Sequence, residues 1–582
     1  MTKLLLRPLA FACCGASLLL SGCVDDSFDL DNMDGTTQIK VNNLTIPLEF
    51  SEGIKFDDVV DLESEELVEV DSRGHYVLLK SGEFESDLIE INEINAVPNV
   101  ATFVSEPVKI NEVVAGMKIP FNAEGYARFD FAFSHNDVDA YIRDIRSAEV
   151  DFDITLSVST GIACEFTNLC FRMPAGMTGH VAGNYGDVSE EGSLITFSRV
   201  NAPNGDFSFV YHVTALDVQA AGGSFVAKGN GDKGTFSLSN SISLVSGEIE
   251  ALETRPVELQ ASFNLGSIRV NSISGGIRYK VDDFSESANL DNLPDLLTDK
   301  NTRLGLSNPQ LYLRVHNPFG KYGAKASTDI TLKQQRADVA DFLPESTQTV
   351  TTSSPVQVST AETQTFLLAV SKPDYIYEKY AEAVWDEKYA LPGLGHIVYG
   401  IGLPDGLDFV FANPLLDSDN VIGFPIGQPV GRVYGDYTFY APLDFSAGSQ
   451  IVYSQEQSDW GLEDLAVNGL EVAADVNSSI PVEILLTAVP LVKTDNGDLV
   501  EADGVEISPV TIPAMASGTS VSLKMTGGEI YNLDGMRYTI TLLSASKGNE
   551  GALGPENSLD LKNLKITVSG HYDLTEEDDD EE

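Results

Sequence analysis

The sequence predicts a mostly β fold, because apolar and polar residues alternate along many short stretches. The alternation is clearest in residues 150–158, 311–315 and 470–476, where one face of a strand would be apolar and the other polar. Turn sequences rich in Gly, Asn and Asp separate such stretches, as at 229–232 and 495–498. We therefore expect sheets to form nearly all of the core.

Helical signals are few and short. Residues 373–388 give the best one, because Pro373 stands where a helix would begin and Tyr, Ala and Glu residues share one face. Two shorter stretches, 137–145 and 289–297, are further candidates. We expect one clear helix at 373–388 and little other helical structure.

The spacing of the strands indicates how they are organised. Short strands separated by turns at this spacing are typical of immunoglobulin-like β-sandwiches. The chain has 582 residues, which suggests roughly four domains at about 150 residues each. A hydrophobic content of 43% is that of a globular chain rather than a disordered one. The predicted fold is therefore several immunoglobulin-like β-sandwich domains in series, with few short helices.

The first 22 residues have the organisation of a secretory signal. Lys3 and Arg7 are their only charged residues, and the apolar run 9–20 is too short to span a bilayer. The run leads into Leu-Ser-Gly-Cys, ending at Cys23, which resembles the lipobox of bacterial lipoproteins. The resemblance implies cleavage before Cys23 and acylation of its sulfur and of the new amino group. The alternative is an ordinary signal peptide that contains a cysteine.

An acidic cluster follows the cysteine directly. Residues 24–31 read Val-Asp-Asp-Ser-Phe-Asp-Leu-Asp, which resembles the export signal of surface lipoproteins in Bacteroidota. The resemblance implies a lipid-anchored protein in the outer membrane, exposed on the cell surface. The alternative is a solvated tether that holds the body of the protein off an anionic membrane.

A strand followed by Asn-Pro carries a second resemblance. Residues 308–320 read Asn-Pro-Gln-Leu-Tyr-Leu-Arg-Val-His-Asn-Pro-Phe-Gly, which resembles the strand signature of the LEA14-type sandwich. Asn-Pro would stop the strand, because Pro cannot donate a ladder hydrogen bond. With 293–297, 440–443 and 533–535, the pattern looks like uncharacterised surface lipoproteins of Bacteroidota. The resemblance implies the sandwich fold and brings no activity or site residue.

These signals divide the chain into eight segments. The predicted boundaries are 1–22 (signal peptide), 23–45 (acidic tether), 46–135 (β domain), 136–255 (β-sandwich), 256–365 (LEA14-like β-sandwich), 366–460 (β domain with one helix), 461–575 (β-sandwich) and 576–582 (acidic tail).

The charge balance restricts the partners. The chain carries 88 acidic and 36 basic residues, for a formal net charge of −52. Such a chain repels phosphate backbones and anionic lipid surfaces, so we expect no nucleic-acid partner. Like charge also keeps a crowded surface protein soluble.

Two cysteines remain after the signal and the proposed lipid site. Cys164 and Cys170 are close enough in sequence to form a small-loop disulfide in an oxidising compartment. The alternative is two buried free thiols on separate strands, and the sequence leaves both open.

No local metal or dinucleotide motif stands out. Residues 229–234 match G-x-G-x-x-G, but strand-like sequences flank them on both sides, which predicts a hairpin turn. None of the seven histidines has the spacing of a local metal site. Calcium stays open, because residues 417–420 and 29–32 cluster oxygen ligands, although neither has the spacing of the twelve-residue calcium loop. We expect no cofactor otherwise.

Aromatic residues are the candidates for ligand contact. Trp385 follows a tyrosine-rich stretch, and Tyr434, Tyr437 and Tyr440 recur at spacing three. Aromatic faces can stack on sugars, although such residues are more often half-buried packing residues. Two or three coplanar aromatic rings in a shallow cleft would indicate glycan binding.

We predict a lipid-anchored, non-catalytic surface protein acting in adhesion, ligand binding or envelope architecture. Its partners would be the membrane, through the lipid, and a glycan or a host or envelope protein. One alternative is a glycan-binding lipoprotein of a nutrient-uptake system. Another is a hydrolase with two carboxylates about 5–9 Å apart in a cleft, for which the sequence offers no local motif.

Overall fold

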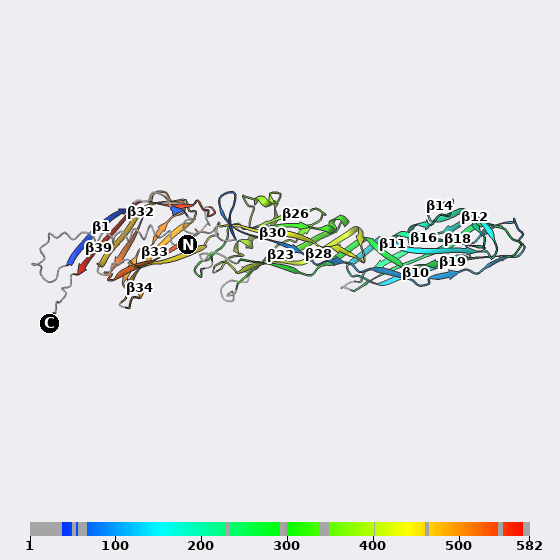
Figure 1. The fold of residues 1–582 in the computed structure, drawn as a ribbon, viewed down its shortest axis with the longest axis horizontal. Coiled ribbons are helices and arrows are strands. Elements are labelled where there is room, and N and C mark those ends of the chain that lie inside the picture. Colours follow the sequence, from blue (N-terminus) through cyan, green and yellow to red (C-terminus); the bar gives the residue numbers. More distant parts are fainter. Residues whose placement is uncertain are drawn as a thin grey trace, which may run out of the picture.

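The computed structural model forms three lobes in line (Figure 1). Among the described residues it has 39 strands, three short 3-10 helices and no complete α-helix, so the mostly β prediction is confirmed. In that same part of the chain, no helix is long and apolar enough to cross a membrane. The structure describes residues 38–48, 54–55, 67–228, 232–290, 297, 299–336, 349–400, 402–459, 465–494, 496–544 and 551–573.

The terminal lobe contains both the first and the last described strand. One sheet has the order β1-β39-β32-β37-β35, with β2 also on β39, and the other has β31-β38-β33-β34, with β36 on β33. The strands are β1 (Gln38–Leu48), β2 (Ile54–Lys55), β31 (Gln450–Gln457), β32 (Leu465–Ser478), β33 (Glu483–Lys493), β34 (Leu499–Glu501), β35 (Val505–Ile507), β36 (Val510–Ile512), β37 (Thr519–Gly527), β38 (Leu533–Leu543) and β39 (Ser558–Asp573).

The middle lobe packs two sheets face to face. One has the order β27-β26-β22-β30-β4-β3, and the other contains β21, β23, β24, β25 and part of β28. The elements are β3 (Val68–Val70), β4 (Tyr76–Glu85), β21 (Phe284–Asn289), β22 (Gln310–His316), η2 (Pro318–Tyr322), β23 (Lys325–Gln335), β24 (Thr349–Thr351), β25 (Val356–Val358), β26 (Gln364–Ala369), η3 (Glu378–Tyr380), β27 (Val384–Ala390), η4 (Pro392–His396), β28 (Gly406–Pro425) and β30 (Tyr434–Pro442).

The distal lobe is built from one long stretch of chain around a phenylalanine-rich core. Its longest strands, β11 and β18, run side by side with their neighbours along the lobe (Figure 1). The strands are β5 (Ile89–Glu90), β6 (Ile94–Pro98), β7 (Thr102–Val104), β8 (Val108–Ile110), β9 (Lys118–Asn122), β10 (Arg128–Val138), β11 (Ile142–Ser159), β12 (Cys164–Arg172), β13 (Met177–Ala182), β14 (Val188–Glu191), β15 (Leu194–Ala202), β16 (Asp206–Asp217), β17 (Gly223–Val226), β18 (Gly234–Ala251), β19 (Val257–Leu265), β20 (Ile268–Lys280) and β29 (Pro429–Gly431), which pairs with β5.

The lobes are nested in the sequence. The chain passes from the terminal lobe through the middle lobe to the distal lobe and returns the same way, so β1 pairs with β39 and β4 pairs with β30. These pairings join segments that the sequence-based division assigns to different domains. They also place residues 38–45, within the predicted tether, in strand β1.

Strand β28 links the middle and distal lobes. It pairs with β23 over residues 406–417 and with β20 over residues 415–425. The apolar core is also continuous across the junction. Phe424 on β28 belongs to the distal-lobe core and stacks on Phe319 of the middle lobe. The junction is therefore a continuous sheet over a continuous core.

The predicted strands are confirmed. Residues 150–158 lie in β11, 311–315 in β22 and 470–476 in β32. β17 ends at Val226 and β18 begins at Gly234, and the two strands pair antiparallel, so the hairpin predicted around 229–234 is also confirmed, although residues 229–231 lie outside the described residues.

The helix prediction for residues 373–388 is wrong. Only η3 is helical there, and Val384–Ala390 form β27, which pairs in parallel with β26. The tyrosines of this segment pack on the sheet instead of forming one helical face, and the open edge of β26 supplies hydrogen-bond partners for β27. The helix predicted at 137–145 is also wrong, because β10 ends at Val138 and β11 begins at Ile142. The third candidate, 289–297, lies almost wholly outside the described residues.

Asn317 ends β22, as the Asn-Pro sequence predicts. Its side chain is fully buried, accepts from the backbone N–H of Phe319 at 3.1 Å, and donates to the carbonyls of Ala324 at 3.0 Å and Val358 at 3.1 Å. One side chain therefore closes the turn and ties it to β25. Pro318 follows at the start of η2, where its missing N–H costs nothing.

We expect Asn317→Ala to lower the free energy of unfolding by roughly 2–4 kcal/mol, because it leaves two buried carbonyls without donors. Urea unfolding followed by circular dichroism measures this loss. The matched control is Asn122→Ala, whose exposed side chain accepts a single bond from the backbone of Glu124. Equal, small effects of the two changes would contradict this role of Asn317.

Candidate ligand-binding groove

An open groove lies on the middle lobe, across the outer face of β4, β30 and β22, and reaches Glu286 on β21 of the facing sheet. Its volume is about 480 Å³, within the usual range of ligand sites. The lining residues are Glu83, Phe84, Glu85, Glu286, Arg314, His316, Thr363, Tyr434, Gly435 and Asp436.

Strand register assembles the groove in two rows. In the first row Tyr434 lies between Glu85 and His316 on the neighbouring strands. In the second row Asp436 lies between Glu83 and Arg314. Side chains directly opposite one another on paired strands come within about 5.5 Å at their Cβ atoms, so each row presents three side chains to the same space.

Tyr434 is the aromatic surface of the groove. Half of it is exposed, at 50% of its full accessible area. Its ring lies 4.8 Å from the His316 ring at an angle of 40°, and His316 Nδ1 lies 3.5 Å from the Thr363 hydroxyl. The ring stands on a central strand of the sheet, so its position is fixed before any ligand arrives.

Arg314 is the basic group of the groove. Its guanidinium donates to the Glu382 carboxylate at 2.9 Å, lies 3.8 Å from Asp436 and stacks over the Tyr380 ring at 4.7 Å. The hydrogen bond to Glu382 is the main reason why the pKa of Arg314 is raised. Its orientation is therefore held from outside the groove.

The carboxylates outnumber the bases. Glu85 pairs with Arg432, and Asp436 accepts from the Tyr380 hydroxyl at 2.6 Å. Glu83 and Glu286 have no ion pair within the described parts of the chain. The groove therefore has an acidic character, with acceptors that face solvent.

Aromatic residues cover the other half of the same sheet face. Tyr312, Tyr380 and Tyr440 are fully buried, and Tyr312 stacks on Tyr380 at 4.8 Å. The segment that contains η3 supplies this cover, with Tyr377 stacked on Tyr440 at 4.9 Å. Only the end of the face that holds Tyr434 stays open.

A buried acid anchors this cover. Asp71 accepts from the Tyr440 hydroxyl at 2.6 Å and from the Arg73 guanidinium at 2.8 Å. Burial alone would raise the pKa of Asp71. The hydrogen bonds from Tyr440, from the backbone of His75 and from Arg73 lower it by more than burial raises it, so the pKa lies below its usual value.

The four aromatic candidates from the sequence separate in space. Tyr434 lies in the groove, and Tyr440 lies beneath the cover on the same face. Tyr437 points to the opposite face, where its ring packs on Phe409 at 4.3 Å. Trp385 is partly buried against the tyrosine cluster. The groove thus offers one tyrosine and one imidazole, not a row of coplanar aromatic rings.

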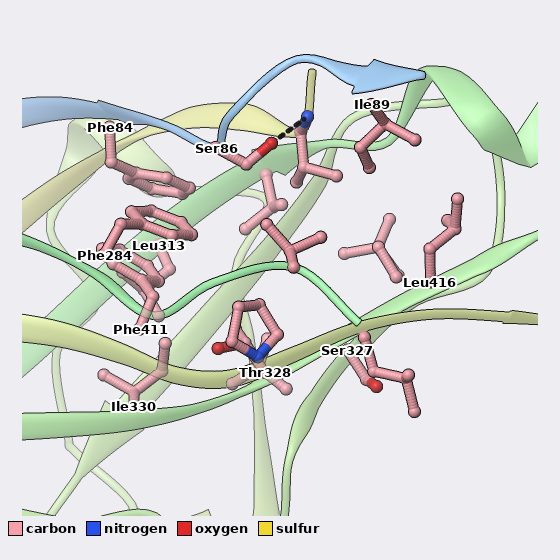
Figure 2. Close-up of a pocket in the computed structure, with 18 residues that line it drawn as sticks. Phe84, Ser86, Ile89, Phe284, Leu313, Ser327, Thr328, Ile330, Phe411 and Leu416 are labelled. Carbon is pink, nitrogen blue, oxygen red and sulfur yellow. Dashed lines mark hydrogen bonds between the residues drawn. The ribbon is translucent and has the colours of Figure 1, made fainter. Parts of the chain in front are cut away.

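A second, apolar cavity lies between the two sheets of the middle lobe (Figure 2). Its volume is about 50 Å³. Phe84, Phe284 and Phe411 stack at one end of it, with ring centroids 4.4 and 4.6 Å apart. The Ser86 hydroxyl at its rim accepts from the Val433 N–H at 3.1 Å and donates to a neighbouring carbonyl. We interpret it as a packing void of the sandwich.

The two cysteines are free thiols in this structure. Cys164 and Cys170 lie on the same strand, β12, six residues apart, so their Cα atoms are separated by roughly 20 Å. A disulfide requires Cα atoms within about 7 Å, so the disulfide alternative is wrong for this fold. Burial raises the pKa of the Cys164 thiol. Cys23 lies outside the described residues.

Residues 417–420 are not arranged as a calcium site. They lie in β28, where Arg146 donates to the Asp419 carbonyl at 2.6 Å and to the Asn420 side chain at 2.8 Å. Within the described ranges, no three His, Cys, Asp or Glu side chains converge on a position that would hold a metal. The other candidate, 29–32, lies outside these ranges.

Sequence spacing missed the groove because register creates it. Glu85, His316 and Tyr434 come from three strands that are far apart in the chain. The same is true of His180 and His212 in the distal lobe, which register places opposite each other with ring centroids 5.4 Å apart. Only a knowledge of strand pairing would have found either group.

Comparison with known proteins adds little. No family model matches the chain, and no curated protein matches it. Among solved structures, a candidate secreted protein from Parabacteroides distasonis ATCC 8503 aligns with a TM-score of 0.31 and 13% identity, covering 50% of this chain and 82% of that one. A structure of Sulfolobus turreted icosahedral virus aligns with a TM-score of 0.13 and 11% identity, covering 82% and 93%. Similarities at these scores carry no argument about fold or function.

We expect Tyr440→Phe to lower the free energy of unfolding at pH 7 by about 1–3 kcal/mol, because a bond to a buried carboxylate is lost. The pKa of Asp71 is lowered by folding, so its ionised carboxylate stabilises the fold at pH values above its unfolded pKa near 3.8. The difference in unfolding free energy between wild type and Tyr440→Phe should therefore shrink as the pH falls through the folded pKa of Asp71. Denaturant unfolding at pH 7 and at a series of pH values below 3.8 measures both effects. Tyr434→Phe, on the same strand but exposed, is the control and should leave stability unchanged. A difference that does not shrink at any pH below 3.8 would contradict this role of Asp71.

Proposed function

We propose that this chain is a lipid-anchored, non-catalytic surface protein that holds a binding surface away from the membrane. The observation that carries the proposal is the pairing of β1 with β39, which puts both ends of the described chain in one terminal lobe. The other two lobes extend from it in line (Figure 1). An anchor at the chain start would therefore hold one end of an elongated molecule.

The position of Cys23 supports this arrangement. Cys23 precedes Gln38, the first residue of β1, by 15 residues. Even a fully extended chain of that length spans at most about 50 Å. A lipid on Cys23 would keep the terminal lobe near the membrane and leave the distal lobe as the part farthest from it.

The junctions between lobes support a stiff molecule. β28 makes one sheet continuous between the middle and distal lobes. At the other junction, the Tyr76 N–H donates to the Leu553 carbonyl at 2.8 Å, and the Leu553 N–H donates to the Leu443 carbonyl at 3.1 Å. The apolar core of the middle lobe also continues into the terminal lobe, where it includes Val476 and Ile484. Packed apolar junctions resist the bending that flexible linkers allow.

The charge fits the same role. A net charge of −52 repels an anionic membrane and keeps neighbouring copies apart. We propose that the protein is located in the outer leaflet of the outer membrane and that its lobes are immunoglobulin-like sandwiches. Its role would be adhesion, ligand binding or envelope architecture. The expected partners are a glycan or a host or envelope protein, and not nucleic acid.

Labelling with a palmitate analogue in the native host tests the anchor. The wild-type chain should carry the label and sediment with membranes, whereas Cys23→Ala should lose both properties because the lipobox resemblance makes Cys23 the acylated residue. Cys14→Ala, within the predicted signal, is the matched control and should be labelled normally.

Retained label on Cys23→Ala would overturn the anchor. Exposure is tested separately by treating intact cells with proteinase K. A surface protein is degraded, and a chain that stays intact until the cells are lysed would contradict the proposed address.

A further inference from the structure

We infer that the groove on the middle lobe is a binding site for a neutral carbohydrate. This inference goes beyond the proposed anchoring role and specifies the ligand class. It rests on the proposed function only for the location at which the protein would encounter the ligand. The groove itself belongs to the folded chain whether or not a lipid is attached.

The aromatic ring is the first reason. Tyr434 is half exposed although it stands on a central strand, where its neighbours Tyr437 and Tyr440 are buried. An exposed, pre-positioned ring offers an apolar face at low entropic cost. The C–H face of one sugar ring matches such a surface, and the His316 ring, 4.8 Å away and tilted by 40°, borders it without forming a second coplanar platform.

The hydrogen-bonding groups around the ring are the second reason. Glu83 and Glu286 present acceptors without ion pairs in the described chain, whereas Arg314 and Thr363 present donors. A ligand that both donates and accepts at closely spaced positions satisfies such a mixed set. Sugar hydroxyl groups do both, so each polar group that the ligand covers would then find a partner.

The charge of the groove selects against other ligands. Four carboxylates line it, against one guanidinium that Glu382 and Asp436 already engage. Sulfated, sialylated or phosphorylated ligands would be repelled. A cationic peptide would be attracted by Glu83 and Glu286 but would meet the Arg314 guanidinium at the end of the second row, so oligolysine is the competing probe. A neutral ligand avoids both penalties.

Strand geometry makes the site specific. The two rows, Glu85–Tyr434–His316 and Glu83–Asp436–Arg314, lie next to each other on three paired strands. Their side chains are held by backbone register, and Arg314 is further held by Glu382 and by the ring of Tyr380. A ligand would therefore bind without rearrangement of the sheet.

The test uses the full-length protein, purified in detergent, and an array of neutral oligosaccharides of glucose, mannose, galactose and xylose. Sialylated and sulfated glycans and an oligolysine peptide are printed on the same array. We expect binding to one or more neutral oligosaccharides and none to the charged probes. Affinity for the best neutral probe is then measured by calorimetry.

Tyr434→Ala should weaken that affinity about tenfold or more, because it removes the stacking surface. Tyr434→Phe keeps the ring and should bind like wild type. Tyr126→Ala is the matched control, an exposed tyrosine of the distal lobe, and should also bind like wild type.

A second variant guards against misfolding. Thr363→Trp fills the exposed rim of the groove without touching the core and should block binding. Circular dichroism confirms that each variant is folded. Three results would overturn the inference: no neutral oligosaccharide bound by the folded wild type, binding to oligolysine alone, or unchanged affinity in both Tyr434→Ala and Thr363→Trp. None of them depends on whether Cys23 carries a lipid, so failure here and failure of the anchor are distinguishable.

Discussion

The sharing of β28 between two sheets is the constraint on which the rest of the structure depends. This strand of 20 residues gives its first part to the middle lobe and its last part to the distal lobe. The two parts meet where β11, β20 and β28 lie side by side. Gly275 allows this close approach, because a Cβ on it would lie 2.1 Å from the Asp144 carbonyl oxygen. The lobes are therefore aligned by backbone hydrogen bonds and not by a linker.

The same alignment positions the groove. Glu85 ends β4, Tyr434 begins β30 and His316 ends β22, so the open end of the sheet face lies toward the junction with the distal lobe. The tyrosine-rich segment around η3 covers the other end, where Asp71, Arg73 and Tyr440 tie it down. One sheet face is thus divided into a sealed half and an open half, and only the open half can meet a ligand.

Local sequence patterns were sufficient to predict strands but not their pairing. Alternation located β11, β22 and β32, and Asn317-Pro318 located a strand end, because both are set by nearby residues. The pairing of β1 with β39 leaves no local signal, since it joins residues more than 500 positions apart. The helix prediction for 373–388 was wrong for a related reason. The hydrogen bonds that make β27 a strand come from the edge of β26, and the sequence of 373–388 contains no signal for that partner.

The candidate site was predicted only in part. The spacing of three in Tyr434, Tyr437 and Tyr440 suggested one platform, but a strand alternates with a period of two. Tyr437 therefore turns into the core, and Tyr434 alone reaches the groove. His316, Glu85 and Arg314 join it through register, which the sequence does not display. Cys164 and Cys170 show the same limit, because one extended strand keeps apart two residues that a loop would have brought together.

The most direct test is the distance of each lobe from the membrane. Single cysteines at Asp498 in the terminal lobe and at Arg255 in the distal lobe, in a Cys170→Ser background, would carry a fluorescent donor, with an acceptor lipid in proteoliposomes. Strand lengths in the three lobes place these positions on the order of 100 Å apart if they lie in line. We expect strong energy transfer from position 498 and almost none from position 255. Equal transfer from the two positions would contradict this expectation, because the molecule would then lie flat or be held by another part of the chain.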